Sequence, residues 1–173
     1  MSESFHDLVI GIKPISLFDF KGAVPELLPL ETCEQSPKWH GEGNVLIHSD
    51  MAGKIAQQEL TKEILLPHDY KVNIYLATLL HDIGKPEASF VKEGKIVAYN
   101  HGKIGVWKAR DFLRKYFPEF NFARREWIAS LIEFHMSPRE LVTSLAKPSR
   151  YKRFSLDSST LESYLLSRAD LRG

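Results

Sequence analysis

A histidine and an aspartate stand next to each other, as His81 and Asp82, directly after an almost wholly apolar run over residues 74–80. A helix that is apolar nearly all round is normally buried. Gly84 and Pro86 are typical of a helix end, so the imidazole and the carboxylate would lie at the buried end, where a lone charge is costly. Most adjacent His-Asp pairs are ordinary polar residues, so further ligands must accompany this pair before it indicates a metal site.

Further candidate ligands stand along the chain: His48, His101, His135 and Asp170. Imidazole nitrogens and carboxylate oxygens bind Mn, Fe, Co, Ni or Zn, and carboxylates also bind Mg. A bound divalent metal lowers the pKa of a coordinated water and polarises a phosphoryl oxygen, and both effects promote phosphoester hydrolysis. The residues therefore predict a divalent-metal site with hydrolytic chemistry, for which no serine or cysteine nucleophile is required.

In sequence order these residues read H, HD, H, H and D, which resembles the HD-domain superfamily of metal-dependent phosphohydrolases. The resemblance implies one metal with four protein ligands: His48, His81, Asp82 and Asp170. For His101 and His135 it implies either a second metal or the positioning of phosphate. We favour the one-metal form, because no extra carboxylate accompanies these two histidines.

Lys85 stands three positions after Asp82, so that the adjacent His81 and Asp82 begin the pattern HDxxK. In some members of the superfamily this lysine contacts the substrate phosphate or supports the catalytic acid, so the resemblance implies catalytic roles for Asp82 and Lys85. An equally good interpretation of Lys85 is a solvated lysine that stabilises the C-terminal end of a helix dipole.

The segments before and around the doublet look like the HD domain of bacterial tRNA nucleotidyltransferases, the CCA-adding enzymes. In that family the domain resembles a phosphatase and 2′,3′-cyclic phosphodiesterase. His40 and Glu42 stand where its entry reads His-Pro-Glu-Gly, and Gly41 replaces the proline. These two residues are predicted either at the rim of the pocket, where they bind substrate, or in a hydrogen-bonded structural loop. The likeness covers about residues 26–136 and includes residues 27–29, 35–37, 39–45 and 76–86.

The predicted function is metal-dependent hydrolysis of a small phosphorylated substrate, a nucleotide or an RNA-end phosphate. In 173 residues we expect no nucleotidyltransferase domain, which excludes CCA addition. No GYP motif follows the HD core, which argues against a cyclic-di-GMP phosphodiesterase. A 5′-deoxynucleotidase and a non-catalytic metal-binding regulatory module remain as alternatives, because both would keep the same metal residues.

A basic stretch with Arg150 and Lys152 precedes the segment that carries Asp170. The chain between two ligands must pass near the pocket, so these side chains are predicted to border its mouth and to bind substrate. An ordinary solvated surface is the alternative. Residues 103–173 carry 14 Lys and Arg against 8 Asp and Glu, which suits a phosphate-bearing substrate.

The composition is ordinary for a soluble globular protein, with 43% hydrophobic and 26% charged residues. A net charge of +1 argues against a general preference for polyanions or membranes. The only cysteine, Cys33, cannot form an intrachain disulfide, which suits a reducing compartment. We find neither a signal peptide nor an apolar run of about 18 residues. We therefore expect a cytoplasmic protein.

The elements that must position the ligands are predicted to form an all-α HD-domain bundle of six or seven helices with one small β-hairpin. Residues 1–173 should form a single domain, on which residues 1–25 pack as an extension of short strands or loops. A basic loop is expected over residues 147–153. The hairpin is predicted over residues 88–99. One helix is predicted to begin after the N-cap Asn44, a second to end at Asp82, and a third to run from the capping box Ser159-x-x-Glu162 to Asp170. Further helices are predicted over residues 25–34, 101–118, 123–136 and 139–145.

Overall fold

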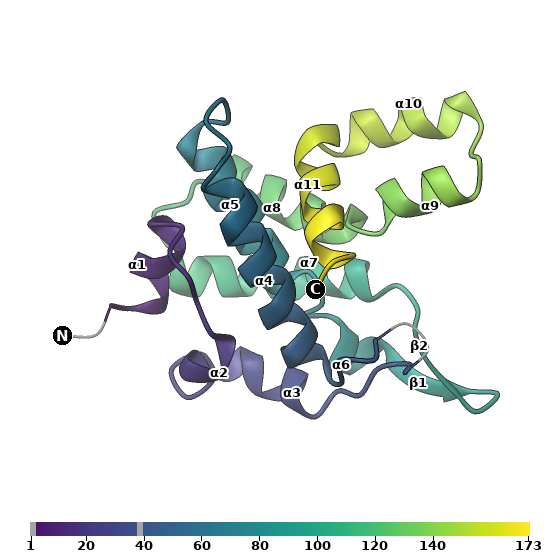
Figure 1. Ribbon diagram of the computed structural model, residues 1–173, viewed down its shortest axis with the longest axis horizontal. Helices are drawn as coiled ribbons and strands as arrows, with labels where there is room; N and C mark the ends of the chain where they lie inside the picture. Colours follow the sequence, from purple (N-terminus) through teal and green to yellow (C-terminus); the bar gives the residue numbers. More distant parts are fainter. Residues whose placement is uncertain (1–2, 38–39) are drawn as a thin grey trace.

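The structure is a computed structural model that describes residues 3–37 and 40–173, and the middle of its fold is helix α5 (His68–Leu80) (Figure 1). All residues from Val72 to Leu80 are buried. Three helices pack against α5: α4 (Val45–Leu60), α8 (Phe122–Phe134) and α11 (Thr160–Asp170). The helix carries no charged side chain over residues 72–80, so burial on every side costs no ionised group.

The predicted all-α fold with one small hairpin is confirmed, but the described residues form eleven α-helices rather than six or seven, because several are only one or two turns long. The two strands pair in antiparallel fashion, with Phe90 opposite Val97. No helix in the described part of the chain is both long and apolar enough to cross a membrane. The other elements are α1 (Phe5–Ile10), α2 (Leu17–Phe20), the 3-10 helix η1 (Pro25–Leu27), α3 (Leu28–Glu31), α6 (Lys85–Ala88), β1 (Ser89–Lys92), β2 (Lys95–Ala98), α7 (His101–Tyr116), α9 (Ser137–Thr143) and α10 (Pro148–Asp157).

The N-terminal residues contradict the prediction of short strands or loops, because they form α1 and α2. Apolar side chains of this segment join the main hydrophobic cluster of the bundle. The segment is also held through its backbone: Leu17 N–H donates to Oδ1 of buried Asp50 at 2.7 Å, and Tyr75 Oη donates to the Lys13 carbonyl at 2.9 Å. Helices of four and six residues are too short to show a 3.6-residue period in the sequence.

Two predictions of secondary structure are wrong because of proline. The stretch over residues 147–153 is not a loop: α10 begins at Pro148, where a missing N–H costs nothing at the first position of a helix. The single helix predicted over residues 25–34 is instead η1 followed by α3, which ends at Glu31. Pro29 has no N–H with which to continue a regular helix from η1.

Helix ends agree only in part with the prediction. Asn44 does cap α4, since its side chain accepts from Ile47 N–H at 3.0 Å. Ser159 precedes α11 but makes no capping hydrogen bond, so the predicted capping box is not formed.

Two glycines bring the start of α7 into backbone contact with its neighbours. A Cβ added to Gly84 would lie 2.1 Å from the carbonyl oxygen of His101 and 2.6 Å from the backbone nitrogen of Gly105. A Cβ added to Gly102 would lie 2.6 Å from the carbonyl oxygen of Glu133, near the end of α8. Only residues without a side chain allow this approach, which carries His101 toward the turn after α5.

We predict that Gly84→Ala lowers the free energy of unfolding by at least about 1–3 kcal/mol, because the added methyl meets backbone atoms that cannot rotate away. Urea unfolding followed by circular dichroism measures this loss. Gly22→Ala is the matched control, since nothing lies within 4 Å of a Cβ there. Equal stability of the two variants would contradict the packing argument.

Candidate metal centre

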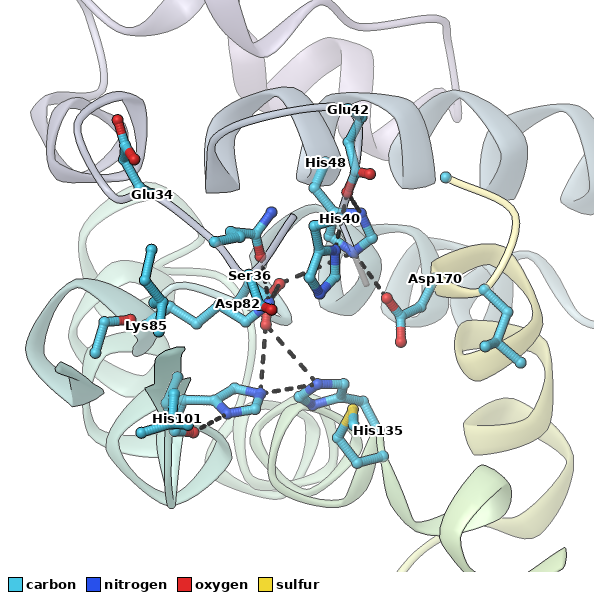
Figure 2. Close-up of a pocket in the computed structure, with 18 of the residues that line it drawn as sticks. Glu34, Ser36, His40, Glu42, His48, Asp82, Lys85, His101, His135 and Asp170 are labelled. Carbon is cyan, nitrogen blue, oxygen red and sulfur yellow. Dashed lines mark hydrogen bonds and ion pairs between the residues drawn. The ribbon is translucent and has the colours of Figure 1, made fainter. Parts of the chain in front are cut away.

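The metal-site residues predicted from the sequence meet at the turn that follows α5. His81 and Asp82 are 0% and 1% exposed. His48 comes from α4, Asp170 ends α11, His101 opens α7 and His135 directly follows α8. Figure 2 shows His101 and His135 below Asp82, His48 above it and Asp170 to its right. The structure therefore brings together all six residues, although they come from five helices or their ends: α4, α5, α7, α8 and α11.

Asp82 lies at the centre and turns each carboxylate oxygen to a different group of side chains. Its Oδ2 lies 3.2 Å from Nε2 of His81 and 3.9 Å from Nε2 of His48. Its Oδ1 lies 3.4 Å from Nε2 of His101 and 3.9 Å from Nε2 of His135. One carboxylate thus connects two pairs of histidines.

Three of the histidines are oriented by the same local hydrogen bond. Nδ1 of His81, His101 and His135 lies 2.7 Å from a backbone carbonyl three residues earlier in each case. A carbonyl only accepts, so Nδ1 carries the hydrogen and Nε2 is the nitrogen that faces Asp82. Histidines that bind metals through Nε2 are commonly held by a hydrogen bond of this kind at the other ring nitrogen.

His48 reaches the same arrangement through side chains. Its Nε2 lies 2.8 Å from Oδ1 of Asp170, and its Nδ1 lies 2.9 Å from Oε1 of Glu42. Asp170 Oδ1 also lies 3.4 Å from Nε2 of His81. Asp170 is therefore inside the site.

The charges at the centre favour a cation. Burial alone would lower the pKa of His81, but the negative charges of Asp82 and Asp170 raise it to about 10. Burial would raise the pKa of Asp82, yet the positive charges of His81 and Lys85 hold it well below its usual range. Burial and the charge on His81 lower the pKa of His135 to about 4. A bound cation would therefore take the place of the proton on His81, beside the ionised Asp82 and Asp170 and the neutral ring of His135.

A divalent metal ion fits these residues. Nε2 of His81 and both carboxylate oxygens of Asp82 are buried and have no hydrogen-bonding partner among the described residues. Their neighbours are close enough for ion pairs but are not aligned for hydrogen bonds. A buried polar atom without a partner costs about 1–3 kcal/mol, and more if it is charged. Two sets of ligand atoms each lie within 4.8 Å of one another: His48, His81 and Asp170, and His81, Asp82 and His135.

A family model for the HD domain matches residues 45–171. The chain belongs to the HD-domain family. Members of this family are generally metal-dependent hydrolases, and the match contains every residue of the ligand order, from His48 to Asp170. A search of curated proteins finds no match to the chain.

The HD-domain site opens into a pocket of about 900 Å³. Its walls extend beyond the ligands to residues 34–36, to strand β2 with Tyr99, and to Arg139 on α9. The sequence did not single out Tyr99, Arg139 or Gln35 as site residues. Only Gln35 had a signal, because it stands in the segment that resembles the entry of the CCA-adding enzymes.

His40 and Glu42 both line this pocket and also contact His48. Oε1 of Glu42 lies 2.9 Å from Nδ1 of His40 and 2.9 Å from Nδ1 of His48. The geometry agrees with a hydrogen-bonded loop that orients a ligand histidine. Substrate binding by these two residues stays a prediction, and Trp39 of the same segment lies outside the described residues.

Lys85 is buried rather than solvated. Its Nζ lies 2.6 Å from Oδ2 of Asp82 and donates to Oε1 of Gln35 at 2.5 Å. The interpretation as a solvated lysine at a helix end is therefore wrong. The structure places the ammonium group beside the metal site, and its catalytic role stays a prediction.

Arg150 and Lys152 are not brought to the pocket. Both belong to α10, which packs on α9, and Figure 1 shows these two helices beyond α11. Arg150 lines a separate groove between α7 and the α8–α10 region, with Lys103 and Phe154. The prediction that they border the mouth assumed a loop, and a helix carries this stretch elsewhere. Neither residue lines the pocket, so substrate binding by Arg150 and Lys152 stays a prediction.

We predict that His81→Ala and Asp82→Ala lose the bound metal and remain helical, whereas wild-type protein holds one ion per chain. The expectation of one ion follows from the absence of a further carboxylate beside His101 and His135 in the described residues. Elemental analysis and circular dichroism test both points, with His68→Ala as a histidine control outside the site. Full occupancy in the variants would contradict the assignment, and two ions per wild-type chain would make His101 and His135 ligands.

We also predict that metal binding at pH 7 releases about one proton, because a pKa of about 10 leaves His81 protonated in the metal-free protein. The apparent metal affinity should rise as the pH rises toward 10, since the proton competes less. Titration calorimetry in two buffers with different ionisation enthalpies counts the protons. Binding without proton release would show that His81 is not a ligand.

Proposed function

We propose that this HD-domain protein hydrolyses a phosphoester of a nucleotide or of an RNA-end phosphate. The observation that carries the proposal is the position of Asp82: its buried carboxylate joins two pairs of Nε2 atoms at the floor of a large pocket. A pocket of about 900 Å³ is much larger than a phosphate group needs, which favours a substrate of nucleotide size.

The residues around the site would have different roles in this reaction. His48, His81, Asp82 and Asp170 would hold a divalent ion, which when bound activates water and polarises a phosphoryl oxygen. Lys85 pairs with Oδ2 of Asp82, and its positive charge, together with that of His81, keeps this carboxylate ionised.

His101 and His135 complete the floor of the pocket, and their Nε2 atoms lie 3.2 Å apart. With Nδ1 of each ring bound to a carbonyl, Nε2 is the nitrogen left for chemistry. The two rings would either position the phosphate or hold a second ion with Oδ1 of Asp82.

The finer likeness to the CCA-adding enzymes supports a phosphatase or 2′,3′-cyclic phosphodiesterase rather than another hydrolase. Gln35, His40 and Glu42 belong to the segment that carries this likeness, and all three line the pocket. This segment lies before residues 45–171, which match the HD-domain family. The proposal of an RNA-end substrate therefore rests on two observations together, the resemblance to the CCA-adding enzymes and the position of these residues in the pocket.

We predict metal-dependent release of phosphate or opening of the cyclic ester when the protein is loaded with Mn, Co, Ni or Mg and given a substrate panel. The panel contains ribonucleoside and deoxyribonucleoside 5′-monophosphates, 3′-phosphates and 2′,3′-cyclic phosphates, with products separated by chromatography. Asp82→Ala should fall to the rate of metal-free protein. The control Asp111→Ala, an exposed carboxylate on α7, should keep wild-type activity.

The results of this panel distinguish the proposed function from the two alternatives. Hydrolysis restricted to deoxyribonucleoside 5′-monophosphates would identify a 5′-deoxynucleotidase instead. A protein that binds the metal but hydrolyses no phosphoester would be a regulatory module, and the proposed function would be wrong.

A further inference from the structure

Gln35 carries an unusual pair of atoms at the edge of the metal site. The residue is only 6% exposed and lines the pocket. Its Oε1 accepts a hydrogen bond from Nζ of Lys85 at 2.5 Å. Its Nε2 is buried and has no hydrogen-bonding partner among the described residues.

The orientation of this amide follows from the chemistry of its neighbour. A lysine ammonium group has three donors and no acceptor, so only the oxygen of Gln35 can face Lys85. Turning the amide over would place its two N–H donors against the ammonium group. Nε2 is therefore the atom directed away from Lys85, and it is a donor to which the described residues offer no acceptor.

A buried donor without an acceptor costs about 1–3 kcal/mol, so its retention in the folded protein needs an explanation. The described protein atoms supply no acceptor, and because Gln35 lines the pocket, a group bound there can supply one. The residue is joined through Lys85 to Asp82, which places it at the metal end of the pocket. A substrate that is hydrolysed at this end brings anionic phosphoryl oxygens, which are strong acceptors.

We propose that Gln35 binds the substrate phosphate: Nε2 donates a hydrogen bond to a non-bridging phosphoryl oxygen, while Oε1 holds Lys85 beside Asp82. This proposal rests on the proposed function. The two ends of one amide would thereby link the position of the phosphate to the position of the ammonium group. Gln35 is then a substrate-binding residue with its donor, and a positioning residue for Lys85 with its acceptor.

The substitution Gln35→Glu tests the donor of the Gln35 amide separately from its acceptor. Glutamate keeps an acceptor for Lys85 but replaces the amide donor with a second carboxylate oxygen, which repels phosphate. Gln35→Leu removes both ends at similar size. Gln58→Glu, the same change at an exposed position of α4, is the matched control for the added charge.

The test measures binding of inorganic phosphate to metal-loaded protein by titration calorimetry, together with metal content and the urea midpoint. We expect Gln35→Glu to weaken phosphate binding by about 10- to 100-fold, the loss of one hydrogen bond to a charged group, with wild-type metal content. Gln35→Leu should show a similar loss and also a lower kcat, because Lys85 loses its anchor. Gln58→Glu should bind phosphate as the wild type does.

Phosphate binding within about twofold of wild type in Gln35→Glu would overturn the proposal, because Nε2 would then serve only a bound water. If Gln35→Glu fails to fold, wild-type phosphate affinity in Gln35→Leu overturns it equally. A wild-type protein that binds phosphate in a Gln35-dependent way but hydrolyses no substrate would disprove the proposed function alone. Wild-type protein that binds no phosphate would disprove the inference about Gln35, whatever the assay of hydrolysis gives.

Discussion

The carboxylate of Asp82 is the group on which the rest of this structure depends. It is ionised and almost completely buried, and an isolated charge in such a place would cost several kcal/mol. The fold compensates it from every side with imidazole rings and the ammonium group of Lys85. Those groups come from different helices. The need to place them around one buried negative charge therefore constrains where α4, α7 and α8 meet the turn after α5.

The same backbone geometry serves the helices and the site. His81 and His135 occupy the C-cap positions of α5 and α8, where the last carbonyls of a helix lack partners. Each ring donates through Nδ1 to one of these carbonyls. One hydrogen bond thus completes the helix end and also leaves Nε2 directed at Asp82. A substitution at either position would disturb the helix end and the ligand together.

Much of this centre could be predicted from residue order, and the reasons for the failures are physical. The HD-domain pattern selected the residues that meet at this centre, because the pattern is a property of the sequence and needs no contact. Asp170 could be placed only by the packing of α11 on α4 and α5. Gln35 could not be predicted as a site residue, because its importance comes from a hydrogen bond to Lys85 across 50 positions of the chain. Arg150 was misplaced because Pro148 starts a helix where charge alone suggested a loop.

The distance along the chain between ligands has a consequence for the order of events in folding. His48 and Asp170 are 122 positions apart, yet their side chains lie 2.8 Å from each other. Contacts between such distant parts of a chain form late, because a large loop must close first. A growing polypeptide on the ribosome would already expose His48, His81 and Asp82 while α11 has not been made. Docking of α11 would therefore complete the proposed set of four ligands, and an ion held by all four would mark a molecule whose folding includes α11.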